Sequence, residues 1–348
     1  MVVPPSHPAC EALEPRCLMS AGLPRPDHVV IVVEENQGYD EVLGERRFPF
    51  LVSNQLDFYH ADPFIRELAK YGASLTDMHA LRHPSLPNYL AMFSGSSQGV
   101  TNDAVPKTPL TEPSLGGQLL ASGLTFRGFS EDLPAVGFDG IKSGDYVKRH
   151  APWTMFADVP AELNKPFSQF PSDFNQLPTV SFVIPNLQHD MHSASIRKAD
   201  HWLESNIKDY AKWATAHNSL LIVTWDEGSQ LNHIPTIFFG AGVRRGAVDL
   251  PANHFRLLRT IEGMYDLPLL GEAANHTPLR KLFTAGTTTT SAQQVRPMEV
   301  PRATPLFSTT PIAGSTWSVL SMFMHNDGDD LQPVIESRAA PPDNRGFR

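Results

Sequence analysis

The chain has 348 residues, of which 41% are hydrophobic and 19% are charged, and its formal net charge is −9. This length allows one large domain or two small ones, and the acidic balance excludes nonspecific nucleic-acid binding, which needs basic surfaces. No apolar run in the sequence is long enough to span a bilayer. The two cysteines, Cys10 and Cys17, precede the first predicted strand, so neither a disulfide framework nor a cysteine metal site is expected.

Residues 1–26 form a proline-rich segment without the apolar core of a standard signal peptide. Residues 13–20 (LEPRCLMS) are similar to a short segment found near the start of many exported bacterial proteins. We therefore expect residues 1–26 to be a disordered leader or an export-type segment. The expected location is outside the cell or on its surface, with the cytoplasm as the alternative.

Strand and helix patterns alternate from residue 28 to residue 285. Residues 28–33 (HVVIVV) form a continuous β-branched run, which is typical of a strand buried on both faces. In chain order the patterns predict a strand at 28–33, a helix at 63–71, a strand at 73–78, a helix from residue 85, a helix at 115–122, strands at 124–130 and 179–184, a helix at 200–217, strands at 219–225 and 234–239, and a helix at 254–265. This order predicts an α/β fold, a three-layer αβα sandwich with a mostly parallel central sheet.

The character of the sequence changes after residue 285. Residues 286–291 (GTTTTS) read as a low-complexity linker, and the rest of the chain is rich in proline, serine and threonine around one apolar island at 317–324. We expect one folded domain at 27–285 and a largely unstructured tail at 286–348.

The segment 83–89 (HPSLPNY) places a hydroxyl group where a helix begins. The start of a helix presents free backbone N–H groups and a partial positive charge, which suit a phosphate group. The Ser85 hydroxyl is therefore a candidate nucleophile toward that phosphate. The alternative is that Ser85 is only the N-cap of the helix.

Polar side chains gather where the predicted strands end, which is the edge of an open α/β sheet where sites form. These residues are Glu34, Glu35 and Asn36 after the first strand, His79, His83 and Ser85 after the second, Asn186, His189, Asp190 and His192 after the fourth, and Asp226 and Glu227 after the fifth. Such an oxygen-rich mixture suits a hard divalent cation, and the histidines also allow zinc or manganese.

Five ordered segments resemble one known family. Residues 34–40 (EENQGYD), 83–89 (HPSLPNY) and 225–228 (WDEG) resemble the metal-dependent phosphoesterase family, which groups bacterial acid phosphatases with phospholipases C inside the alkaline-phosphatase-like superfamily. Residues 184–192 (IPNLQHDMH) and 232–240 (NHIPTIFFG) resemble two further blocks of that family. The resemblance covers about residues 28–285 and implies an alkaline-phosphatase-like fold for the phosphoesterase catalytic domain.

The resemblance also implies roles for particular residues. One divalent cation, with zinc, manganese, magnesium and calcium all open, would be held by Glu35, Asn36, Asp226 and Glu227. Ser85 aligns with the nucleophile position, and Asn88 would donate to a phosphoryl oxygen. The resemblance also places Asp190 and His192 in the same cleft and His150 against the substrate. His192 and His150 are the candidates to protonate the leaving alcohol. Further candidates to contact the substrate are Asn186, His83, His233 and His254, with a plain loop role open for His233 and a helix-start role open for His254.

These residues imply metal-dependent hydrolysis of phosphate monoesters, as in acid phosphatases, through a phosphoseryl intermediate. The substrate would be a small-molecule or lipid phosphate ester. Phospholipase C or another phosphodiesterase on the same fold is the first alternative, and an inert exported binding module is the alternative of another class.

Some residues have simpler expected roles or depart from the family pattern. Glu34 is expected to point to the opposite face of its strand from Glu35, and Asp200 to be the N-cap of the helix at 200–217. Gly38 stands where the family usually has serine, and Ser193 and Ala194 replace a common Asp-Gly pair. Both departures bear on the shape of the cleft and hence on the range of substrates.

Overall fold

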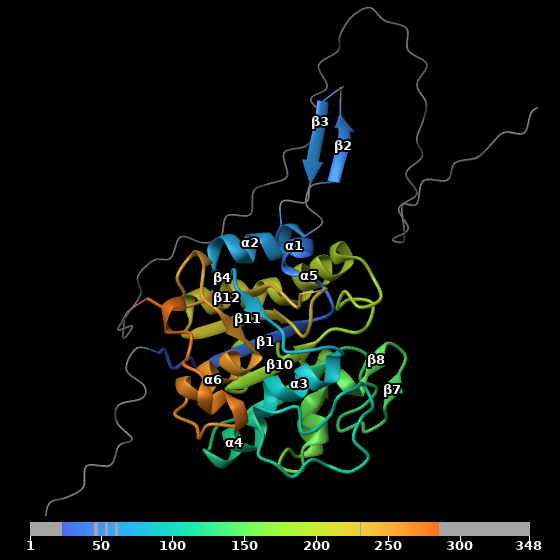
Figure 1. Ribbon diagram of the computed structural model, residues 1–348, viewed down its shortest axis with the longest axis vertical. Coiled ribbons are helices and arrows are strands. Elements are labelled where there is room, and N and C mark those ends of the chain that lie inside the picture. Colours follow the sequence, from blue (N-terminus) through green and yellow to red (C-terminus); the bar gives the residue numbers. More distant parts are fainter. Residues whose placement is uncertain (1–22, 45–47, 53–54, 60–61, 230, 285–348) are drawn as a thin grey trace, which may run out of the picture. The chain divides into compact units, whose positions relative to one another are not determined.

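The computed structural model describes residues 23–44, 48–52, 55–59, 62–229 and 231–284 (Figure 1). Most of the predicted leader, the whole predicted tail and its apolar island at 317–324 lie outside these residues. The predicted domain boundaries and the predicted export of the chain therefore stay predictions.

The central sheet has eight strands in the order β13-β4-β12-β11-β1-β10-β6-β9. Five neighbouring strands are parallel, and they are β11 (Ser219–Trp225), β1 (His28–Glu34), β10 (Val180–Ile184), β6 (Phe126–Ser130) and β9 (Asn164–Pro166). The strand direction reverses at β12 (Thr236–Gly240), which runs antiparallel to both of its neighbours, β11 and β4 (Ala73–Leu75). At the edge of the sheet, β13 (Gly246–Val248) is parallel to β4. The sheet is mostly parallel, as the alternating pattern predicts.

Helices cover both faces of this sheet (Figure 1). One layer contains α1 (Tyr39–Val42), α2 (Pro63–Tyr71) and α5 (Ile196–Ala216). The other contains α3 (Ser85–Ser94), α4 (Leu115–Ala121) and α6 (His254–Met264). The predicted three-layer αβα sandwich is therefore confirmed.

Short pairs and single turns complete the described fold. The pairs are β2 (Phe48–Val52) with β3 (Gln55–Tyr59), β5 (Met78–His79) with β14 (Ala252–Asn253), and β7 (Lys142–Ser143) with β8 (Tyr146–Val147). The 3-10 turns are η2 (Lys148–His150), η3 (Pro152–Met155), η4 (Ala161–Leu163), η5 (Phe167–Gln169), η6 (Phe174–Gln176), η7 (Gly271–Asn275) and η8 (Arg280–Leu282). None of the helices in the described ranges combines the length and the apolar character that crossing a membrane requires.

The core is organised around β1, whose apolar residues from Val29 to Val33 are fully buried between the two helical layers. Burying a side chain of this size stabilises the fold by about 1.5–3 kcal/mol. The register pairs Val30 with Ser181 on one side and with Leu221 on the other. Because these three central strands run parallel and in step, their carboxyl ends meet at one edge of the sheet.

Two predicted elements differ from the structure. The strand predicted at 73–78 is divided into β4 and β5, which belong to different sheets. The long helix α5 begins at Ile196 rather than at residue 200, because the Ser195 hydroxyl accepts a hydrogen bond from the Lys198 N–H and caps it. The prediction that Asp200 is the N-cap of this helix is therefore wrong.

Candidate active site

Backbone hydrogen bonds connect the ends of the three central strands. The Glu35 N–H donates to the Asp190 carbonyl at 2.7 Å, and the Asp226 N–H donates to the Glu34 carbonyl at 3.0 Å. The Asn36 N–H donates to Asp226 Oδ1 at 3.3 Å. Asn36 has a φ of 55°, in the left-handed region that asparagine tolerates better than most residues. The chain thus turns sharply after Glu35 and keeps residues from three strands together.

Ser85 is the first residue of α3, and Pro84 takes the cap position. The Ser85 hydroxyl donates to Glu35 Oε2 at 3.1 Å, so it bonds a carboxylate rather than a backbone N–H of its helix. Burial raises the pKa of Asp226 and of Glu227, and the nearby Ser85 hydroxyl opposes that rise in both. Ser85 therefore lies against an acidic cluster, by which we mean the carboxyl groups of Glu35, Asp190, Asp226 and Glu227. The expectation that Ser85 only caps its helix is wrong.

Tyr89 lies one turn along α3 from Ser85, and its hydroxyl donates to Glu35 Oε1 at 2.5 Å. Sequence reasoning gave Tyr89 no role. Residues i and i+4 share one face of a helix, so the spacing of Ser85 and Tyr89 was the signal that both reach the same partner. Two hydroxyl groups of α3 thus fix both oxygen atoms of the Glu35 carboxylate.

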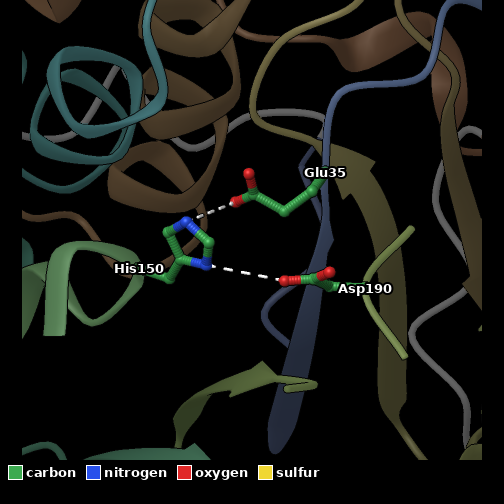
Figure 2. Close-up of side chains that lie close together, drawn as sticks. All are labelled: Glu35, His150 and Asp190. Atoms are coloured by element: carbon green, nitrogen blue, oxygen red, sulfur yellow. Dashed lines mark ion pairs between the residues drawn. The ribbon is translucent and has the colours of Figure 1, made fainter. Parts of the chain in front are cut away.

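His150 lies between two carboxylates (Figure 2). Its Nε2 is 3.3 Å from Glu35 Oε1, and its Nδ1 is 3.5 Å from Asp190 Oδ2. The ring stacks on Tyr89 with centroids 5.2 Å apart, and the side chain is 1% exposed. Three potential ligand atoms from Glu35, His150 and Asp190 lie within 4.8 Å of one another.

The carboxyl groups of the cluster are crowded and shielded from water. Burial, followed by the charges of Asp226 and Asp190, raises the pKa of Glu35 well above its ordinary value. Burial and the neighbouring Glu227 raise the pKa of Asp226 in the same way, and burial raises the pKa of Asp190 to about 7. Carboxyl groups at such close range hold either protons or a cation.

Two of the histidines are neutral for the same reason. Burial, followed by the charges of Arg149 and His192, lowers the pKa of His150 well below its ordinary value. Burial lowers the pKa of His254 to about 4. His254 begins α6, and its Nε2 donates to the backbone oxygen of Asp226 at 2.6 Å. It supports the turn that carries Asp226.

The exposed rim of the cluster carries two further predicted histidines. His83 is half-exposed, and its Nδ1 lies 2.8 Å from Glu227 Oε2. His192 is exposed, and its Nε2 lies 3.4 Å from Nη2 of Arg149. Because a guanidinium only donates hydrogen bonds, Arg149 is the donor in this contact.

The side chains of three predicted site residues are engaged away from the carboxylates. Asn88 donates to the Arg82 carbonyl at 2.7 Å and accepts from backbone N–H groups, which fixes the loop before Ser85. Asn186 donates to Asp132 Oδ2 at 2.6 Å. His233 Nε2 lies 2.9 Å from the Thr76 carbonyl, outside the cluster. Their proposed contacts with substrate stay predictions.

Gly38 is explained by its surroundings rather than by the chemistry. A Cβ at this position would lie 2.7 Å from the Ser229 hydroxyl and 3.1 Å from Glu41 Oε2. The serine usual in the family would therefore crowd the loop that follows Asp226. The departure from the family pattern leaves the carboxylate cluster itself unchanged.

The cluster fits a hard divalent cation. Asp226 Oδ2 and Asn36 Oδ1 are buried and have no hydrogen-bond partner among the residues that the structure describes. Oxygen atoms of this kind, with the Glu35 carboxylate, are the donors that such cations prefer. The overlapping set of Glu35, His150 and Asp190 adds an imidazole, which zinc and manganese accept.

Comparison with known proteins gives three similarities. The family model of the Phosphoesterase family matches residues 52–268. A Mycobacterium tuberculosis protein named phosphatidylinositol-3-phosphatase is 44% identical over 270 residues, which are 76% of this chain and 86% of the relative. A Penicillium chrysogenum protein named phosphate-repressible acid phosphatase is 28% identical over 65% of this chain, which spans 60% of that relative's length.

The fold has a counterpart among solved structures. A protein of the alkaline phosphatase superfamily from Vibrio parahaemolyticus superposes with a TM-score of 0.50 and 15% sequence identity. The match covers 74% of this chain and 72% of that protein. At this identity the likeness shows a shared fold, which is the alkaline-phosphatase-like fold that the motifs imply.

Proposed function

Because the chain belongs to the Phosphoesterase family and is a phosphoric ester hydrolase, we propose that it cleaves phosphate monoesters with Ser85 as the nucleophile. The observation that carries this proposal is the placement of the Ser85 hydroxyl 3.1 Å from Glu35 Oε2, at the start of α3. An inert binding module is set aside, because family membership makes the chain an enzyme.

We further propose one divalent cation, held by Glu35, Asn36 and Asp226. When bound, such a cation neutralises phosphoryl charge and lowers the pKa of a hydroxyl that it contacts. Glu227, the fourth predicted ligand, is paired with His83 through its Oε2 atom. The set of Glu35, His150 and Asp190 is the competing position for the same ion.

The reaction then uses the groups of this cluster in order. The Ser85 oxygen attacks phosphorus, its proton leaves toward Glu35, and the bond from phosphorus to the alcohol oxygen breaks. The partial positive charge at the start of α3 stabilises the charge on the phosphoryl oxygens. Water then cleaves the phosphoseryl ester, which returns the proton to Ser85 and releases inorganic phosphate.

The departing alcohol takes a proton from His192 or His150, and the imidazole that serves must carry an extra proton when the ester is bound. His150, which burial keeps neutral in the free protein, first has to take up that proton. General acid catalysis of this kind contributes about 10²–10⁴ in rate. Single substitutions separate the two residues: the acid is the one whose loss harms esters with poor leaving groups more than aryl esters with good ones.

The substrate class that we favour is a phosphate monoester on a small molecule or a lipid headgroup. The relative named phosphatidylinositol-3-phosphatase supports the lipid version. Diester cleavage, as in a phospholipase C, is the alternative on the same fold. The apolar cavity of about 70 Å³ lined by residues that include Phe138, Trp153 and Val159 does not decide between the two, because a lipid monoester and a lipid diester both carry an apolar part.

The test uses p-nitrophenyl phosphate, bis-p-nitrophenyl phosphate and vesicles that carry phosphatidylinositol 3-phosphate, each before and after treatment with a chelator. We expect the monoesters to be hydrolysed, activity to be lost with the chelator, and added divalent cation to restore it. Preference for the diester would overturn the monoesterase proposal. Full activity in the chelator would overturn the proposed cation.

A further inference from the structure

Arg149 stands beside the active site but has no role in the reaction as described so far. It belongs to η2, directly before His150, and its side chain is 22% exposed. Its charge is felt inside the cluster, where it lowers the pKa of His150 and opposes the upward shift of Asp190. A positive charge thus lies beside the acidic cluster.

The guanidinium group of Arg149 has donors to spare. Nη2 contacts His192 at 3.4 Å, close to the limit of a hydrogen bond, and Nε is buried without a hydrogen-bond partner within the described ranges. The remaining contact is a loose ion pair, with Nε 3.8 Å from Asp103 Oδ2. A rigid fork of five donors that binds so little of its own protein is suited to an external anion.

The Asp103 carboxylate shows where that anion would sit. Its Oδ1 accepts a hydrogen bond from the Leu86 N–H at 3.0 Å, directly after Ser85 at the start of α3. Burial sets the direction of the pKa shifts of Glu227 and His150, and the Asp103 charge acts upward on both, so Asp103 lies within electrostatic reach of the two groups. The carboxylate is 41% exposed and lies in the irregular segment between α3 and α4. The Asp103 carboxylate is thus held by the start of α3 and by Arg149, next to Ser85.

The charge of the substrate decides what this arrangement is for. A phosphate monoester brings up to two negative charges, whereas a diester brings one and has one fewer free oxygen. A bound divalent cation would meet part of the charge of either ester. In this acidic site the second charge of a monoester is still costly unless a further positive group meets it. Arginine binds two oxygen atoms of a phosphoryl group side by side, which a lysine cannot do.

We propose that Arg149 and the Leu86 N–H bind the phosphoryl oxygens of a monoester, and that the Asp103 carboxylate occupies this anion position until substrate displaces it. This inference rests on the proposed monoester hydrolysis and names the residue that selects for it. Arg149 is then the determinant of monoester over diester specificity.

The test compares kcat/KM for p-nitrophenyl phosphate and bis-p-nitrophenyl phosphate in the metal-loaded full chain. We expect Arg149→Ala to lower the monoester value by ~10²-fold and the diester value by less than ~10-fold. Arg149→Lys should recover part of the monoester loss, because it keeps the charge without the fork. Arg25→Ala removes an equal charge from an exposed ion pair with Asp266, and both values should stay within about 2-fold of wild type.

Binding of inorganic phosphate gives a second readout that does not depend on turnover. Its inhibition constant should rise in Arg149→Ala. It should fall by about 3-fold or more in Asp103→Asn, which keeps an acceptor for the Leu86 N–H but removes the competing charge. If Arg149→Ala does not fold, Arg149→Gln and the Asp103→Asn result decide the question.

Three outcomes separate this inference from the proposed function. Equal losses on both esters in Arg149→Ala, or weaker phosphate binding in Asp103→Asn, would overturn the inference while leaving monoester hydrolysis intact. A wild-type enzyme that prefers the diester would overturn the proposed function itself. A specific monoester loss with tighter phosphate binding in Asp103→Asn supports both.

Discussion

The starts of α2 and α3 lie in opposite helical layers, and each receives a carboxylate from a distant part of the chain (Figure 1). At α2, both oxygens of Asp200 accept hydrogen bonds, from the Phe64 N–H at 3.2 Å and the Ile65 N–H at 2.7 Å. Asp200 is 2% exposed and held inside α5. At α3, a single oxygen of the half-exposed Asp103 accepts, and the neighbouring hydroxyl is that of Ser85.

The difference separates a structural cap from a site for an exchangeable anion. Two hydrogen bonds donated to a fixed, buried carboxylate satisfy the helix start and leave no N–H group for a ligand. A single hydrogen bond donated to a carboxylate on an exposed segment can instead be donated to a phosphate group. Helix starts with the same backbone chemistry thus serve stability in one layer and reaction in the other.

The largest effect is expected from removing the proposed nucleophile at the start of α3. We expect Ser85→Ala to lower kcat on p-nitrophenyl phosphate by ~10⁴-fold while the free energy of unfolding stays close to that of wild type. The control is Ser181→Ala, which removes a fully buried hydroxyl from β10 and should keep its activity. Near-normal turnover in Ser85→Ala would exclude Ser85 as the attacking group.

A second test asks which carboxylates bind a cation. Asp226→Asn should weaken retention of the divalent cation by at least about 10-fold, since it removes the charge of a buried oxygen without a partner. Asp200→Ala should retain the metal, because that carboxylate serves α2. Metal content after dialysis checks both. If His150→Ala loses the metal and Asp226→Asn keeps it, the ion occupies the competing set instead.

A third test measures stability at the two helix starts. Asp200→Ala leaves two buried N–H groups without partners and should lower the free energy of unfolding by about 3 kcal/mol. Asp103→Ala should cost less than about 1 kcal/mol, because water reaches that helix start. Urea unfolding at pH 5 compares the two variants. Equal costs would remove the distinction between them.

The smallest expected effect is a pH dependence that belongs to Asp200. Burial raises the pKa of Asp200 to about 7, above the value of about 4 for an unfolded chain. The folded protein therefore favours the protonated form of Asp200. The contribution of this group to the free energy of unfolding is complete below pH 4 and is lost as the pH rises through 7. The stability advantage of wild type over Asp200→Ala should shrink by about 2 kcal/mol between pH 5 and pH 8. An advantage that grows with pH would contradict this assignment.

Much of the fold could be predicted because local signals mark it. The β-branched run at 28–33 predicts β1, and Pro63 with Gly72 delimits α2 as the structure has it. The strand predicted at 73–78 was wrong in its extent, since its pattern does not show that its two ends pair with different sheets. Asp200 was misplaced because a sequence cannot tell which helix start a carboxylate reaches.

The candidate site could be predicted in part, because its residues follow strands that the sequence marks. The residues after the central strands converge, since parallel strands bring their carboxyl ends to one edge. The position of His150 between Glu35 and Asp190 depends on the tertiary packing of η2, which no periodicity encodes. The Asp103 contact with Leu86 joins an irregular segment to a helix and leaves no pattern at all.

The proposed reaction depends most on a covalent bond between the Ser85 oxygen and phosphorus. The direct measurement is rapid acid quenching of the metal-loaded enzyme during turnover of p-nitrophenyl phosphate, followed by mass spectrometry of its peptides. We predict one phosphoryl group on the peptide that contains Ser85, and none in Ser85→Ala. Turnover with no phosphorylated peptide, or with the phosphoryl group on another residue, would contradict the account.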